Sequence, residues 1–234
     1  MKNFSAHDVG NHYLNGLLLR ENQEEWVWYH CYNYFSSSRW RKLSSSDYNM
    51  LSLHLSVYLG QANMYHGSSF ILQNGYKVHR EAIQLICSPK YHALSGISCL
   101  DLGLAANRNR LFELTDEITT VYHKIRQHTY ARLDKREPAS PVSQNLITKV
   151  LLGTLGCVPA FDSRALSVFK QFELGPKNYS SEAVLSLIDF YQREEADFNQ
   201  LADIMYHRQI TLPQMKLIDI ILQHAAEKER SVID

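Results

Sequence analysis

The amino-acid sequence predicts an all-α fold. Apolar residues recur with a period of about 3.6 residues over most of the chain, and no segment shows the sustained period-two alternation between turn residues that is typical of strands. With 45% hydrophobic residues in 234, the chain can form a substantial core. We expect two helical subdomains, residues 1–137 and 138–234, with a cleft between them.

The clearest helix is expected at 111–125, where Leu111, Leu114 and Ile118 share one face and Glu113 and Asp116 lie on the other. Ser180 or Ser181 marks the start of a later helix, and Pro213 suits a first helical turn. The segments with helical periodicity are 22–35, 47–62, 111–125, 146–155, 184–191 and 215–225.

Two segments break this pattern. Residues 135–141 combine two prolines with charged and small residues, which is typical of a linker between subdomains. Residues 36–47 form a serine-rich connector with three cations, and we expect Asp47 at its end to cap the helix that follows.

Positive charge is local rather than global, because 24 Lys and Arg balance 24 Asp and Glu. Whole-chain charge therefore gives no reason to expect nucleic acid, and any such binding must use a local patch. Lys and Arg are clustered in several short segments. Such clusters are suited to contacting phosphates, and they are equally consistent with a solvated helix face. The candidate DNA-binding cations in these clusters are Arg39, Arg41, Lys42, Arg108, Arg110, Arg126 and Arg132.

Several chemistries lack their motifs. The four cysteines are widely separated without a CxxC pair, so we expect reduced thiols, no metal and a cytoplasmic protein. Neither a signal peptide nor an apolar run of the about 20 residues that a membrane span needs is present. Phosphate-binding glycine loops and a GxSxG elbow are missing. We expect a monomer without a cofactor.

The most informative segment is 148–164. Twelve uncharged residues, 150–161, precede Asp162, which stands directly before the next expected helix. Asp is among the best N-cap residues, but a carboxylate emerging from a buried wall is costly unless it is paired, capped or used in chemistry. Asp162 is thus a helix cap, a catalytic group, or both.

A second polar cluster follows the helix end expected at Gly67. Tyr65, His66, Ser68 and Ser69 lie between an apolar helix and another apolar run. These residues either line a pocket or form a C-cap in which Ser68 caps the next helix.

An apolar helix, a short turn with Pro159 and an Asp at the amino end of the next helix resemble, over 143–172, the catalytic segment of the helix-hairpin-helix DNA glycosylases. The resemblance implies an all-α fold with a DNA cleft, in which Asp162 supports loss of a base. A fixed carboxylate stabilises the positive charge that develops on the deoxyribose, or orients the attacking water. The target base is flipped into a pocket. Candidate pocket residues are Tyr65, His66, Ser68, Ser69, Trp26, Tyr29 and Tyr32.

The segment departs from the family in one respect. The family's Leu-Pro-Gly-x-Gly hairpin is replaced by 140–147, which contains no glycine, so hairpin phosphate binding is not predicted. Bifunctional members use a hairpin lysine as a Schiff base. Because Lys149 lies too close to Asp162 in the chain for that role, we expect hydrolysis without strand cleavage, with Lys149 or Arg164 contacting phosphate.

The chain resembles little-characterised bacterial proteins, among them anti-phage DNA glycosylases. The amino-acid sequences that carry this resemblance are those of segments 51–59, 66–73, 97–103, 146–162 and 212–220. This resemblance implies double-stranded DNA, including modified phage DNA, as the partner. Two hypotheses follow. The chain is a monofunctional DNA glycosylase acting through Asp162, or a non-enzymatic helical module that binds nucleic acid or protein and uses Asp162 only as a cap.

Overall fold

The computed structural model describes residues 23–38, 41–207 and 209–233, and the all-α prediction is confirmed there: these residues form helices and connecting loops, without a strand. Before the central loop, the elements are α2 (Gln23–Ser38), α3 (Ser45–Gln61), α4 (Met64–Gly67), α5 (Ser69–Leu72), η1 (Tyr76–His79), α6 (Arg80–Ile86), η2 (Pro89–Leu94), α7 (Cys99–Leu102) and α8 (Ala105–Arg132). After that loop follow α9 (Gln144–Thr154), α10 (Ser163–Gln171), α11 (Ser181–Arg193), α12 (Glu195–Tyr206) and α13 (Gln214–Ile233).

The start of α3 differs from the expectation that Asp47 caps it. The N-cap is Ser44, whose Oγ accepts a hydrogen bond from Asp47 N at 3.2 Å. Asp47 lies at the third helical position, and its Oδ2 accepts from Ser44 N at 2.8 Å. This reciprocal pair is a capping box, so Asp47 acts one turn inside the helix and the helix begins earlier. The helix expected after Ser180 begins as predicted, with Ser180 as the N-cap of α11.

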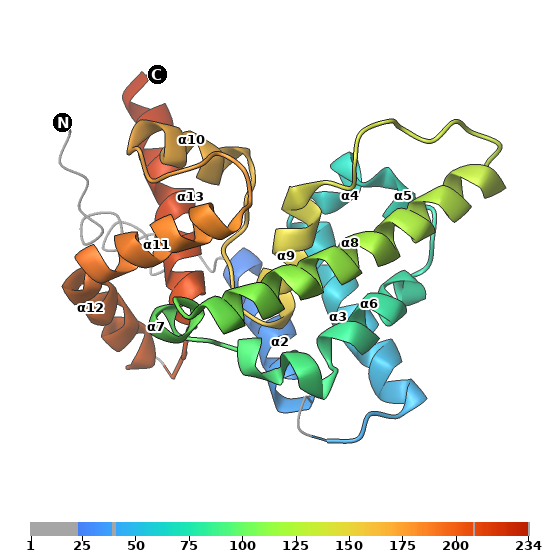
Figure 1. Cartoon of the computed structure of the whole chain (residues 1–234), viewed down its shortest axis with the longest axis horizontal. Coiled ribbons are helices and arrows are strands. Elements are labelled where there is room, and N and C mark those ends of the chain that lie inside the picture. The colour runs from blue at the N-terminus through green and yellow to red at the C-terminus, as the bar shows by residue number, and fades with distance from the viewer. Residues whose placement is uncertain (1–22, 39–40, 208, 234) are drawn as a thin grey trace.

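Helix α8 runs across most of the molecule (Figure 1). It was expected over 111–125 and extends further at both ends, to Ala105–Arg132. Its buried side includes Leu111, Leu114 and Ile118, as the periodicity predicted. Helix α8 contacts α6 and η2 along the chain before it and α9 after it. It therefore packs against elements that precede and follow the central loop in the chain.

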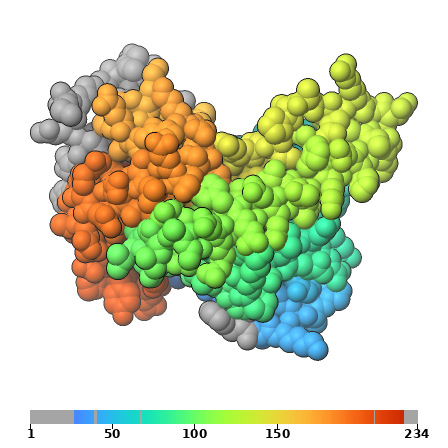
Figure 2. All heavy atoms as spheres, viewed as in Figure 1, coloured from blue at the N-terminus to red at the C-terminus, as the bar shows by residue number. Residues whose placement is uncertain are grey.

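The helices pack around one contiguous cluster of buried apolar side chains. Helices α2, α3 and α9 contact one another, while α10 and α12 pack on α13. The predicted linker at 135–141 lies in the loop between α8 and α9, and the predicted boundary at residue 137 falls in that loop. Helix α9, the first beyond the boundary, packs against α2 and α3. Figure 2 shows the surface hollowed between the part that carries α10 and α11 and the projecting end of α8 with its following loop.

Candidate functional site

The apolar segment before Asp162 is a buried wall, as its composition predicted, because every residue from 150 to 161 is buried. Helix α9 ends at Thr154, and the chain then turns at Gly156, whose φ of +61° is unfavourable for residues with a Cβ. A Cβ at this position would also lie 2.7 Å from Pro213 and 2.9 Å from Tyr32. This tight turn brings the start of α10 back beside α9.

Asp162 is the N-cap of α10, which confirms the capping interpretation. Its backbone is extended, with φ −93° and ψ 178°, and its Oδ1 accepts hydrogen bonds from Arg164 N at 3.1 Å and Ala165 N at 3.0 Å. These two N–H groups have no partner inside the helix, so the side chain satisfies them.

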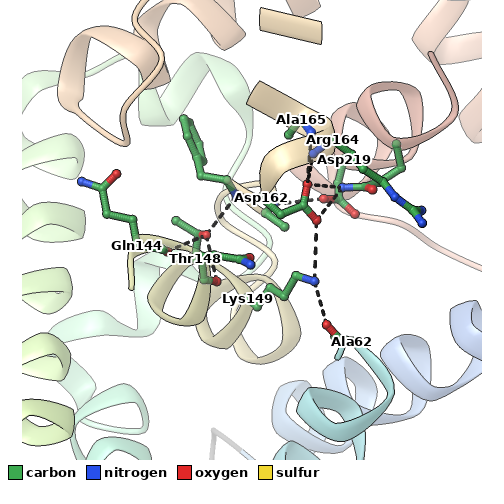
Figure 3. A network of polar contacts seen from close by, with 12 residues as sticks. Ala62, Gln144, Thr148, Lys149, Asp162, Arg164, Ala165 and Asp219 are labelled. Atoms are coloured by element: carbon green, nitrogen blue, oxygen red, sulfur yellow. Dashed lines mark hydrogen bonds and ion pairs between the residues drawn. The ribbon is translucent and has the colours of Figure 1, made fainter. Parts of the chain in front are cut away.

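Two further side chains reach the Asp162 carboxylate from other helices, and Figure 3 shows one of them, Lys149. Gln223 of α13 donates from Nε2 to Oδ1 at 3.2 Å and to Oδ2 at 3.1 Å. Lys149 of α9 places Nζ 3.6 Å from Oδ2 and donates to the carbonyl of Ala62, at the end of α3, at 3.0 Å. The Lys149 and Asp162 side chains are 13% and 14% exposed. The carboxylate is thus held by three helices and still reaches the surface.

The turn before Asp162 is fixed by two polar side chains. Thr148 Oγ1 accepts a hydrogen bond from Phe161 N at 3.0 Å, and Asp219 Oδ1 accepts one from Ala160 N at 3.0 Å. Asp219 also forms a buried ion pair with Lys216, with 2.9 Å between Oδ2 and Nζ. Because these partners come from α9 and α13, the backbone that presents Asp162 is anchored on both sides.

The predicted base-pocket residues of the second polar cluster lie around α4 and α5. Tyr65 is half-buried and donates its hydroxyl to the carbonyl of Ser56 at 2.6 Å. His66 and Ser69 are exposed. Ser68 is buried and occupies both the C-cap of α4 and the N-cap of α5, as the capping alternative predicted, although its side chain makes no capping hydrogen bond.

The aromatic candidates of α2 have separate surroundings. Tyr32 stacks on Trp28 with 5.1 Å between ring centroids, and the Tyr29 hydroxyl donates to the carbonyl of Gln209 at 3.4 Å. The Trp26 side chain lies outside the part of the chain whose side chains the structure describes. Tyr65 lines a small cavity of about 140 Å³ that does not include Asp162.

Besides Lys149, two of the predicted DNA-binding cations are paired with acids. Arg41 Nη2 lies 2.7 Å from Asp47 Oδ1. Arg126 is buried, places Nε 2.7 Å from Glu137 Oε1, and donates to the carbonyl of Ser140 at 2.8 Å. Arg126 therefore anchors the loop between α8 and α9 in this structure.

The other predicted cations are spread over the molecule. Arg108 donates to the carbonyl of Gly103, and Arg110 donates to Asn107 Oδ1 at 3.1 Å, both near the start of α8. Arg132 donates to the carbonyl of Gln73 at 2.6 Å. Lys42 and Arg164 are exposed. Arg39 lies outside the described residues. Of the predicted set, Lys149 is the cation that contacts the Asp162 carboxylate.

The sequence reasoning missed Gln223, which supports Asp162 from 61 residues away. A signal for it exists in α13, where Lys216, Asp219 and Gln223 follow one another at helical spacings of three and four residues. Polar residues repeated on one side of an otherwise apolar helix indicate a shared polar contact.

All four cysteines are thiols rather than disulfides, as expected. Cys31, Cys99 and Cys157 are buried, and Cys87 is half-buried. Burial raises the pKa of Cys99 to about 12 and also raises that of Cys31. Among the described residues, no three His, Cys, Asp or Glu side chains gather to hold a metal ion.

No helix in the described ranges is both long enough and apolar enough to cross a membrane. The chain matches no protein-family model, no curated protein and no solved structure.

Proposed function

We propose that this protein is a monofunctional DNA glycosylase in which Asp162 is the catalytic carboxylate. One observation carries the proposal: the Asp162 carboxylate is fixed by the N–H groups of Arg164 and Ala165 and by Gln223, and its side chain remains 14% exposed. A carboxylate whose position is set before substrate binds loses little free energy to reorganisation during the reaction.

The chemistry needs such a group. Cleavage of an N-glycosidic bond builds positive charge on the sugar, and a nearby carboxylate stabilises that charge or orients the water that attacks it. Two backbone donors occupy Oδ1, whereas Oδ2 is contacted by Gln223 at 3.1 Å and Lys149 at 3.6 Å. Oδ2 is therefore the oxygen that we assign to the sugar or the water.

Lys149 is a positioning residue in this proposal. Its ammonium bridges Oδ2 of Asp162 and the carbonyl of Ala62. The spacing of Lys149 and Asp162 in the chain predicts that Lys149 forms no Schiff base. Because Lys149 Nζ lies 3.6 Å from Asp162 Oδ2, beside the proposed reaction centre, this prediction is tested directly. Hydrolysis by water predicts no covalent adduct between Lys149 and DNA after borohydride reduction.

The experiment incubates the protein with duplexes that carry unmodified, damaged or phage-type modified bases, and treats half of each sample with alkali. We expect strand breaks that depend on alkali, because a monofunctional enzyme leaves an abasic site. The breaks should disappear in Asp162→Asn. Because Asn is as good an N-cap as Asp, this variant removes the charge and keeps the cap.

A matched control is Ser180→Ala, which removes the N-cap of α11, where Ser180 Oγ accepts from Ala183 N at 3.2 Å. This variant should lose about 0.5–2 kcal/mol of stability, more than Asp162→Asn loses, and keep its activity. Equal activity of Asp162→Asn and the unchanged protein would overturn the assignment of Asp162. Breaks without alkali, or an adduct that Lys149→Met abolishes, would show a bifunctional enzyme instead.

The second candidate function is a non-enzymatic helical module that binds nucleic acid or protein. It is favoured by the same capping contacts, because satisfying the first turn of α10 is a sufficient structural reason for an Asp at this position. For this candidate we expect no alkali-labile sites on any duplex, and unchanged stability and DNA binding in Asp162→Asn.

A further inference from the structure

A second site lies between η1, α6 and the last turns of α8, where the surface forms a groove with a volume of about 660 Å³. This volume is within the range of small-molecule sites. Helix α6 contacts α8 (Figure 1), and the groove follows their junction. We call it the basic groove, and its polar and charged lining residues are Asn74, Lys77, Arg80, Glu81, Gln84, His128, Thr129 and Arg132.

The spacing of these residues places the cations on facing surfaces. Lys77, Arg80 and Gln84 follow at three and four residues along η1 and α6, and His128 and Arg132 are four apart on α8. Glu81 is the single acid in the lining, against the cations Lys77, Arg80 and Arg132. The groove is therefore locally positive in a chain whose formal net charge is zero.

The cations of the basic groove differ from many others in this protein. Lys90, Arg41, Arg126, Lys149 and Lys216 all lie within 4 Å of a carboxylate. In contrast, none of the groove's Lys, Arg or His side chains forms an ion pair with an acid in the described part of the chain. Because Lys77, Arg80 and Arg132 line one groove, an anion that binds in it gains favourable Coulomb energy from all three.

Arg132 is held in place across the groove by uncharged partners. Its Nη2 donates to the carbonyl of Gln73 at 2.6 Å and to Asn74 Oδ1 at 3.3 Å. Asn74 in turn donates from Nδ2 to Thr129 Oγ1 at 2.8 Å and to the carbonyl of Phe70 at 2.7 Å. A guanidinium has five N–H donors, so Arg132 keeps donors for a ligand while its position is fixed. This arrangement lowers the entropic cost of binding.

An aromatic pocket adjoins the basic groove. The small cavity lined by Tyr65 and Tyr76 shares Asn74 and Val78 with the groove. Tyr76 is 42% exposed, and Lys77 Nζ lies 5.9 Å from the centre of its ring. Phosphate-binding cations beside an accessible aromatic ring are the combination that binds nucleotides, because bases stack on the ring while the cations hold the phosphate.

We infer that the basic groove binds the phosphate of a nucleotide unit, either a free nucleotide or one unit of a single strand, with the base beside Tyr76 and Tyr65. Lys77, Arg80 and Arg132 contact the phosphate. Asp162 does not line the basic groove. The inference about nucleotide binding is therefore independent of the proposed glycosylase activity.

The test measures fluorescence anisotropy of a labelled oligothymidylate of about 10 nucleotides, a length that one single-strand-binding fold covers. All proteins carry Asp162→Asn, so failure of the proposed catalysis cannot affect the result. Replacing both Lys77 and Arg132 with Gln should weaken binding about tenfold and reduce the slope of log affinity against log salt by about 1 for each cation removed.

The matched control is Lys124→Gln, which removes one charge from an exposed position of α8 outside the groove. It should change the dissociation constant less than about twofold. Lys77→Gln alone keeps the test valid if the double variant unfolds, because the Lys77 side chain is exposed. Its effect should exceed that of Lys124→Gln.

Competition then separates the two sources. Displacement of the strand by thymidine 5′-monophosphate supports a free nucleotide, and displacement only by unlabelled strand supports a nucleic acid. Equal loss of binding in Lys77→Gln and Lys124→Gln would overturn the inference, as would equal displacement by an oligoglutamate peptide of the same charge, because either result indicates unspecific attraction of anions.

Discussion

Gln223 donates its side-chain amide to both carboxylate oxygens of Asp162, at 3.2 Å and 3.1 Å, although 61 residues separate the two. Asp162 is therefore bound to α13 as well as to the first turn of α10. Helices α10 and α13 also pack on each other. The carboxylate links two helices through hydrogen bonds. In the proposed function it is also the catalytic group.

The capping role predicts the stability of Asp162 variants. Asp162→Ala should lower the free energy of unfolding by about 0.5–2 kcal/mol, because the N–H groups of Arg164 and Ala165 lose their acceptor. Asp162→Asn should lower it less, since Asn caps as well. Urea denaturation measures both. An Asp162→Ala variant as stable as the unchanged protein would mean that holding the carboxylate there costs as much as the cap gains.

The buried ion pair between Lys216 and Asp219 predicts that removing the charge of one partner alone destabilises the fold more than removing both charges. The two side chains are 6% and 5% exposed. Lys216→Met should lower the free energy of unfolding by about 3–5 kcal/mol, because it leaves Asp219 charged and buried without its cation. Adding Asp219→Asn should recover part of this loss, since the amide oxygen still accepts from Ala160 N. No recovery in the double variant would contradict the electrostatic cause.

Two glycines predict opposite effects of the same substitution. A Cβ at Gly153 would overlap the Tyr58 ring, so Gly153→Ala should lower the free energy of unfolding by about 1–3 kcal/mol. Gly75 has φ −71° and no atom within 4 Å of an added Cβ, so Gly75→Ala should be neutral or raise it by about 0.4–1 kcal/mol. Thermal unfolding of the two variants gives the comparison, and a destabilised Gly75→Ala would refute it.

His79 predicts a loss of stability in weak acid. It is fully buried, its Nδ1 lies 2.8 Å from the Tyr122 hydroxyl, and burial lowers its pKa to about 3. The unfolded chain binds a proton to this residue below its ordinary pKa of about 6.5, whereas the folded chain does not. Stability from neutral His79 is therefore complete above that pH and is lost as the pH falls toward 3.

The expected slope is about 1.4 kcal/mol for each pH unit in this interval. Urea denaturation between neutral pH and about pH 5 measures it. In His79→Gln, which cannot take up the proton, the slope should be smaller by that amount, and an unchanged slope would show that other groups cause it.

The local features of the fold followed from the sequence. The period of Leu111, Leu114 and Ile118 predicted α8, Ser180 predicted the start of α11, and the uncharged segment 150–161 predicted a buried wall. These predictions succeed because helical periodicity and capping depend on neighbours within a few residues. Asp47 was misassigned by one turn because Ser44 and Asp47 satisfy each other's backbone, a pairing that single-residue preferences do not express.

The candidate sites were less predictable, because their partners meet only after packing. Gln223 reaches Asp162 from α13, and Lys149 reaches both Asp162 and Ala62. The basic groove was anticipated only in part: Arg132 of α8 was among the candidate DNA-binding cations, whereas Lys77 of η1 and Arg80 of α6 were not, because they join it only through packing. The basic run at the end of α8 also contains Arg126, which is buried against Glu137.

The four cysteines differ in burial, so their reactivity toward a thiol-specific dye distinguishes the folded from the opened protein. Cys87 closes α6, the helix that forms one wall of the basic groove, and it is the half-buried thiol of the four. A thiol-reactive dye should label the native fold once, at this position, while the other three react only as the fold opens. A molecule that carries more than one label has therefore opened its fold, and the rate at which further labels appear measures that opening.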